Sequence, residues 1–181
     1  MRVKSSNLVE SLSAVLLQLA DVIAKVSTDQ YSLALPVLCG SSVGKHVRHS
    51  LEFVEALLKG RETEIVSYDR RERNLLYEKS PIAASERLVE LASTLCARTW
   101  SGPMRLSYTA NPYSGEEGRT ESFWERELLY VQEHTIHHDA MIRIALEHLG
   151  TKDVPNSFGF AFSTIQFERS KPILSDWDPV I

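Results

Sequence analysis

The spacing of apolar and polar positions predicts several amphipathic helices. Between Asn7 and about Ser27, apolar side chains recur every three or four residues, which is the period of one helix face. The same period runs from a cap at Ser41 or Ser42 to about Lys59, where Gly60 is the predicted stop. A third helix is predicted to begin at Ser80-Pro81, with proline in the first helical position, and to extend to about Arg98.

The longest helical pattern lies between Ser122 and Gly150. Ser122 and Glu125 have the spacing of a capping box, and Gly150 is a plausible residue to follow the last turn. On a helix of 100° per residue, His138 falls at the centre of an apolar stripe formed by Trp124, Leu128, Val131, Ile142, Ala145 and Leu149. This pattern predicts a long helix that carries polar rings on its buried side.

The segments between these helices predict little further regular structure. The long connection from Gly60 to about Ser80 would allow the second and third helices to run parallel. The run from Met104 to Ala110 suggests a short strand, in a small hairpin whose partner is not evident. The aromatic segment Phe158–Phe167 is predicted to form an irregular C-terminal strap. We therefore expect an all-α four-helix bundle in a single domain, 1–181.

Composition excludes some classes of function. A net charge of -4 and a pI near 5.9 argue against nucleic-acid binding through a basic face. No run of eighteen apolar residues occurs, so no membrane association is predicted. The first apolar run is interrupted by Glu10, Gln18 and Asp21 and lacks an evident cleavage site, which does not fit a signal peptide. The expected location is cytoplasmic.

The two cysteines do not suggest a metal or redox motif. Cys39 and Cys96 are too far apart in the sequence for a zinc knuckle or a C-x-x-C pair. We expect them to be core thiols in a reducing compartment.

Histidines on the last helix provide the first candidate chemistry. His134 and His138 lie one turn apart on the buried side, and His137 lies toward its edge. Such a pair can place two imidazole nitrogens about 2.0–2.1 Å from one divalent ion. The alternative is a pair of core histidines with backbone or carboxylate partners. Thr135 stands where the H-E-x-x-H motif carries its glutamate, so the pattern is not that of a zincin.

Two further histidines lie on the second helix. His46 is nearer the apolar centre of that helix, and His49 lies at its boundary. One imidazole from this helix would complete a three-histidine site with open coordination positions, as in catalytic zinc centres. The helical pattern favours His46 for this role.

Two short motifs resemble those of the DinB/YfiT-like superfamily of bundle metalloproteins. They are S-V-G-K-H-V-R-H at Ser42–His49 and E-H-T-I-H-H at Glu133–His138. The resemblance implies an up-down-down-up bundle and a metal bound by His49, His134 and His138, because His49 follows Ser42 by seven residues as in that superfamily. His46 and His137 would then lie beside the ligands and support them, or serve as alternate ligands.

The resemblance also implies an activity. It suggests a metal-dependent enzyme, a transferase that activates a low-molecular-weight thiol at the metal and passes it to a small electrophilic substrate. Zinc or nickel would suit the histidine ligands. A homodimer is one expected assembly. Arg70, Arg71 and Arg73 could bind a carboxylate of the thiol, although a solvated charged loop is the simpler interpretation. The alternatives are a metal-dependent hydrolase and a non-catalytic metal-binding or ligand-binding bundle. The sequence assigns no catalytic acid or base.

Overall fold

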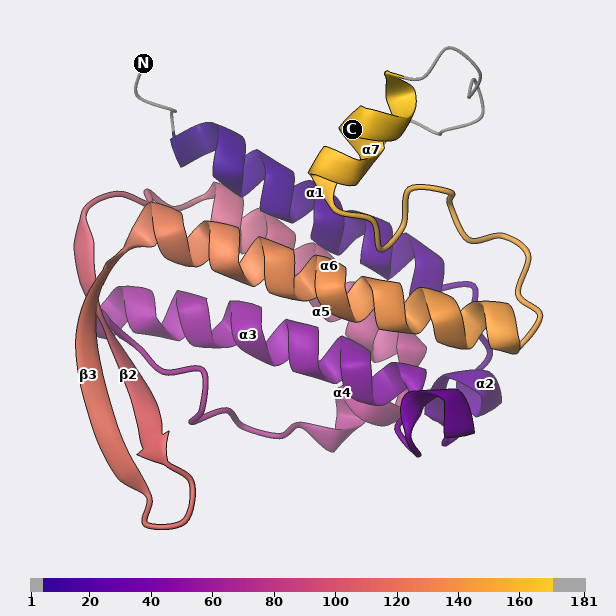
Figure 1. Ribbon diagram of the computed structural model, residues 1–181, viewed down its shortest axis with the longest axis horizontal. Helices are drawn as coiled ribbons and strands as arrows, with labels where there is room; N and C mark the ends of the chain where they lie inside the picture. The colour runs from indigo at the N-terminus through magenta and orange to yellow at the C-terminus, as the bar shows by residue number, and fades with distance from the viewer. Residues whose placement is uncertain (1–4, 171–181) are drawn as a thin grey trace.

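The computed structural model describes residues 5–170, and four long helices form its body (Figure 1). They are α1 (Ser5–Ile23), α3 (Val43–Thr63), α5 (Pro81–Cys96) and α6 (Trp124–His148). Helix α1 packs against α5 and α6, while α3 packs against the same two helices from the other side. The apolar faces predicted from the periodicity meet in one continuous core.

Short elements occupy the connections between the long helices. They are α2 (Thr28–Ser32), the 3-10 helix η1 (Pro36–Leu38), α4 (Leu75–Lys79) and α7 (Phe162–Arg169). Helix α7 lies within the predicted C-terminal strap, so part of that segment is helical rather than irregular. Trp177, near the end of the chain, lies outside the described residues.

A three-stranded mixed sheet shows that the predicted all-α class is wrong. Its strands are β1 (Ile65–Val66), β2 (Pro103–Asn111) and β3 (Glu116–Phe123), in the order β1-β2-β3. β2 pairs antiparallel with β3 from Pro103–Phe123 to Thr109–Glu117, and β1 pairs parallel with β2. The strand suggested at Met104–Ala110 is therefore part of a larger sheet and has partners on both sides.

The sheet fixes the relative direction of the helices. β1 follows α3 and β2 follows α5, and these two strands are parallel. Helices α3 and α5 therefore end on the same side of the molecule, where β3 leads directly into α6 (Figure 1). Each of these three helices thus has one end anchored at the sheet.

Two tryptophans are buried in the core next to the sheet. Trp100 and Trp124 are each 1% exposed, and their rings meet edge to face with centroids 5.5 Å apart. The indole nitrogen of Trp100 donates to the carbonyl of Leu95 at 2.9 Å, so the polar atom of a buried ring has a partner.

Helix ends differ from the prediction at two places. Ser122 belongs to β3, and its hydroxyl donates to Glu127 instead of capping α6, whose cap position is Phe123. Gly60 does not stop α3, which continues to Thr63. A Cβ atom at Gly60 would lie 2.4 Å from Cγ2 of Val66, so glycine there allows β1 to pass close to the helix.

The exposure of the two cysteines differs from the prediction. Cys39 and Cys96 are both exposed, so the expectation of core thiols is wrong.

Among residues 5–170, none of the helices combines the length and the apolar character that crossing a membrane requires.

The packing of Gly44 yields a test of the fold. A Cβ atom there would lie 2.0 Å from the carbonyl oxygen of Glu78 and 2.7 Å from the ring of Tyr31. We expect Gly44→Ala to lower the free energy of unfolding by about 1–3 kcal/mol, because overpacking outweighs the better helix propensity of alanine. Urea unfolding would measure the change. The exposed neighbour provides the control, since Lys45→Ala should change stability by less than about 0.5 kcal/mol. An unchanged stability of Gly44→Ala would contradict the close approach of α3 to Glu78.

Candidate metal centre

Four histidines meet in the seam between α3 and α6. Ser42 caps α3, and its hydroxyl accepts a hydrogen bond from the backbone N–H of Lys45 at 3.2 Å. His46 and His49, three residues apart on this helix, both contact histidines of α6. On α6, His134 and His138 lie one turn apart and face α3. The packing of two helices thus brings together side chains about ninety residues apart in the chain.

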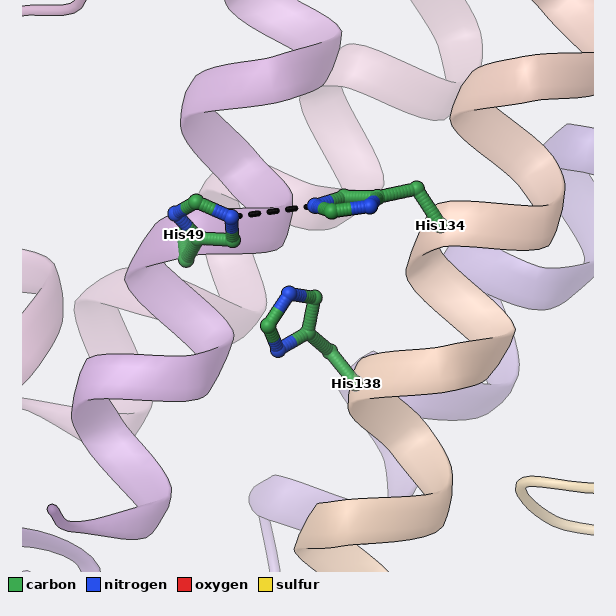
Figure 2. Close-up of side chains that lie close together, drawn as sticks. All are labelled: His49, His134 and His138. Atoms are coloured by element: carbon green, nitrogen blue, oxygen red, sulfur yellow. Dashed lines mark hydrogen bonds between the residues drawn. The ribbon is translucent and has the colours of Figure 1, made fainter. Parts of the chain in front are cut away.

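Three of these rings form a compact group. Nε2 of His49 lies 3.0 Å from Nε2 of His134, and the ring centroids of His49 and His134 lie 4.5 Å and 4.7 Å from that of His138 (Figure 2). One ligand atom from each ring falls within 4.8 Å of the other two. Nitrogens bound to a tetrahedral ion are about 3.4 Å apart when each bond is about 2.0–2.1 Å. The separations in the group, at most 4.8 Å, thus exceed the spacing for one shared ion by no more than about 1.4 Å.

His46 contacts the group from a different side. Its Nδ1 lies 2.9 Å from Nδ1 of His138, and its Nε2 is buried without a hydrogen-bond partner among the described residues. Nδ1 of His138 is thereby engaged, and the other ring nitrogen of His138 points toward His49 and His134 (Figure 2). The helical pattern was correct that His46 is the more buried of the two α3 histidines, whereas His49 is the one within the group.

His137 lies outside the group. It is exposed on α6, and its ring centroid is 5.5 Å from that of His138. No nitrogen of His137 belongs to the set of three ligand atoms described above.

Burial keeps the grouped histidines neutral near pH 7. Removal from water is the largest cause in each case, lowering the pKa of His49 and of His138 to about 3 and that of His134 to about 4. Positive charge on Arg71 lowers the pKa of His49 and His134 further. The pKa of His46 is also lowered, mainly by burial. Neutral imidazole is the form that binds metal ions.

One of the three predicted arginines approaches this site. The guanidinium of Arg71 lies 4.8 Å from the ring centroid of Phe53, which in turn stacks on His134 with centroids 3.9 Å apart. Arg70 instead pairs with Glu117 on β3, and Arg73 is exposed. The three arginines therefore do not gather at one site, and the segment that carries them is only partly a solvated loop.

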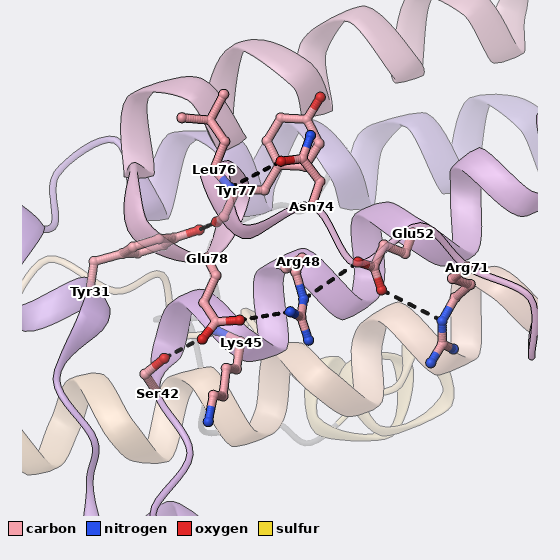
Figure 3. Close-up of polar contacts among 10 residues, drawn as sticks. All are labelled: Tyr31, Ser42, Lys45, Arg48, Glu52, Arg71, Asn74, Leu76, Tyr77 and Glu78. Atoms are coloured by element: carbon pink, nitrogen blue, oxygen red, sulfur yellow. Dashed lines mark hydrogen bonds and ion pairs between the residues drawn. The ribbon is translucent and has the colours of Figure 1, made fainter.

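Sequence reasoning missed an ionic network beside the histidines. Glu52 is 2% exposed and pairs with Arg71 at 3.6 Å and with Arg48 at 3.4 Å (Figure 3). Arg48 also pairs with Glu78 at 2.8 Å. The spacing of Arg48 and Glu52, four residues apart on α3, was the available signal, but such pairs are usually exposed.

Comparison with known proteins finds one curated relative. The chain is 34% identical over 105 residues to FK506-binding protein 5 of Rhizopus delemar. The match covers 56% of this chain and 27% of the relative, so the chain spans about a quarter of that protein's length. No family model matches the chain, and no solved structure matches it.

This relative overturns the resemblance to the DinB/YfiT-like superfamily. FK506-binding protein 5 carries the name of a different family, and no family model supports the resemblance. The function predicted with it, a DinB-like metal-dependent enzyme acting as a thiol transferase, is therefore wrong. The comparisons do not favour the alternatives, a metal-dependent hydrolase or a non-catalytic metal-binding or ligand-binding bundle, any better. The motifs were short, and paired histidines one turn apart occur on helices of unrelated proteins. The thiol, the electrophile and the homodimer stay predictions without a test.

The depressed pKa values predict acid destabilisation of metal-free protein. Between about pH 6.5 and pH 4, an unfolded histidine is protonated while its buried counterpart stays neutral. The unfolded state then binds more protons, so stability falls as pH falls, by up to about 1.4 kcal/mol per pH unit for each histidine. Urea unfolding of chelated protein at several pH values would measure this slope.

Two asparagine variants provide the comparison. His138→Asn should make the free energy of unfolding depend less steeply on pH, because one buried titrating ring is removed. His137→Asn changes an exposed residue of the same helix and should keep the wild-type slope. Equal slopes in wild type and His138→Asn would show that burial does not suppress protonation of His138.

Proposed function

We propose that this chain is a mainly helical domain, related to part of FK506-binding protein 5, that binds one divalent metal ion. His49, His134 and His138 are the proposed ligands. The observation that carries the proposal is that one ligand atom from each of these rings lies within 4.8 Å of the other two. Their lowered pKa values support it, because the rings would not need to lose protons before binding at pH 7.

Zinc and nickel are the proposed ions. Imidazole nitrogen is a good ligand for both, and the geometry does not choose between them. Three neutral ligands leave the ion's full charge and at least one open position. The rings are each partly exposed, so solvent could supply a further ligand.

We propose that His46 positions His138. A metal-bound histidine usually donates its other ring N–H to a neighbouring acceptor, which fixes the tautomer and the direction of the ring. Nδ1 of His46, 2.9 Å from Nδ1 of His138, would be that acceptor. His138 would then bind the ion through Nε2. His46 would contribute to affinity without contacting the metal.

A second candidate function comes from the relative's name. That protein is named for binding FK506, and 105 aligned residues are 34% identical. The shared stretch is a quarter of the relative, so the FK506-binding property could belong to this stretch or to the rest of that protein.

The metal proposal makes a prediction about stoichiometry. Purified wild-type protein loaded with zinc should hold about one equivalent by elemental analysis, and His138→Ala should lose it, because the three rings lie within reach of a single ion. His46→Ala should retain the ion but weaken affinity by about 10–100-fold. His137→Ala is the matched control and should bind as wild type does. Full occupancy in His138→Ala would refute the ligand set.

The second candidate predicts saturable binding of FK506. Two buried tryptophans, Trp100 and Trp124, give a fluorescence signal to follow in a titration. Binding that is equally strong in wild type and His138→Ala would place the FK506 site away from the histidines. A flat titration, with metal binding intact, would show that this stretch does not carry the property for which the relative is named.

A further inference from the structure

A pocket lies between α3, the segment that follows β1, β2 and α6. Its volume is about 240 Å³, and its walls include Phe53, Tyr68, Tyr108 and Tyr130. None of the four histidines in the seam between α3 and α6 is among the residues that line it. The pocket adjoins the proposed metal centre, because Phe53 and Tyr130 of its walls also contact His134, with centroids 3.9 Å and 5.8 Å apart. A ligand in the pocket would not require a bound metal ion.

The back wall of this pocket is held rigidly. The hydroxyl of Tyr68 donates to Glu127 at 2.8 Å, and the carboxylate of Glu127, 0% exposed, also accepts from Ser122 at 2.6 Å and Arg126 at 2.8 Å. Phe53 stacks on Tyr68 with centroids 4.9 Å apart and an interplanar angle of 10°. A wall already ordered in this way loses little conformational entropy when a ligand binds.

Two tyrosines at the edge of the pocket remain partly open to water. Tyr108 is 42% exposed and Tyr130 is 36% exposed. The ring of Tyr108 lies against Gly118 of the neighbouring strand, where a Cβ atom would come within 2.3 Å of that ring. Glycine at position 118 thus allows the ring to lie across β3. Covering these aromatic faces would be favourable for an apolar ring of matching shape.

The mouth of the pocket carries one charge of each sign. The side chain of Arg126 is 58% exposed and stacks over Tyr130 at 4.9 Å while it donates to Glu127. A guanidinium has five N–H groups, so donors remain for a ligand. Asp69 accepts from the backbone N–H of Thr109 at 2.7 Å through one oxygen, and its carboxylate retains further acceptor capacity.

We propose that this pocket binds a small aromatic zwitterion of the aromatic amino-acid class. The ring packs against Tyr108 and Tyr130, the carboxylate pairs with Arg126, and the ammonium pairs with Asp69. The volume suits such a ligand, because a protein cavity of about 150 Å³ accepts benzene and the larger space here leaves room for a short polar side chain.

Titration of the full chain with L-phenylalanine tests the proposal. Amide NMR shifts should saturate, and the shifted residues should cluster around Tyr68, Tyr108 and Tyr130. 3-Phenylpropionate lacks the ammonium, phenethylamine lacks the carboxylate and leucine lacks the ring. Each analogue should bind more weakly than phenylalanine by about fivefold or more, because each loses one of the three contacts.

Matched variants locate the binding. Tyr130→Ala should weaken phenylalanine binding by about tenfold or more, whereas Tyr113→Ala, 99% exposed and outside the pocket, should not. Arg126→Gln should weaken binding of phenylalanine and 3-phenylpropionate but not of phenethylamine. His138→Ala should bind phenylalanine as wild type does, so failure of the metal proposal and failure of this one are separable.

Two results would overturn the proposal. One is the absence of saturable shifts up to about 10 mM phenylalanine. The other is equal affinity in wild type and Tyr130→Ala when circular dichroism shows both variants folded.

Discussion

The contact of 3.0 Å between Nε2 of His49 and Nε2 of His134 sets a constraint on the seam between α3 and α6. Two ring nitrogens at this distance must share one proton or one positive ion, because two lone pairs or two N–H groups would repel each other. The same condition holds between His46 and His138 at 2.9 Å. Two such contacts in one seam mean that the helix packing and the protonation of the histidines depend on each other.

Charged residues beside these histidines on α3 link the seam to the segment between β1 and α5. Arg48 and Glu52 lie on α3, and their partners Glu78 and Arg71 come from the segment between β1 and α5 (Figure 3). Burial raises the pKa of Glu52, and the two arginines act against that rise. Removing one member of a pair would leave a buried charge uncompensated, which would destabilise the fold more than the loss of an exposed ion pair would. The network therefore holds the connection beside the histidines.

Local patterns predicted the parts of the fold that are set locally. The helix of α5 begins as expected at Ser80-Pro81, because capping and the fixed φ of proline act within one turn. The sheet was not predictable in the same way. β3 reads E-E-G-R-T-E-S-F without an alternation of apolar residues, and most of its side chains are exposed, so its pairing with β2 comes from tertiary structure.

In the candidate site too, one part is set by local pattern and another by tertiary packing. The one-turn spacing of His134 and His138 indicated that both would face one way, and the choice between His46 and His49 could not be made from helical position alone. That choice depends on the rotation of α3 against α6, because His46, the more buried ring, contacts His138 without belonging to the group of three. The pocket beside Tyr68 gave no local signal, because Glu127 and Tyr68 are 59 residues apart and meet only through packing.

The position of β3 at the edge of the sheet has a consequence for how molecules of this chain meet in solution. Its outer side has no strand partner within residues 5–170, so its backbone groups could pair with a strand of another molecule. Glu117, Arg119 and Glu121 are exposed along this strand. Charged side chains on an edge oppose the addition of a further strand, because stacking would bury or align their charges. The same polar composition that hid β3 from sequence analysis thus protects the sheet against edge-to-edge aggregation.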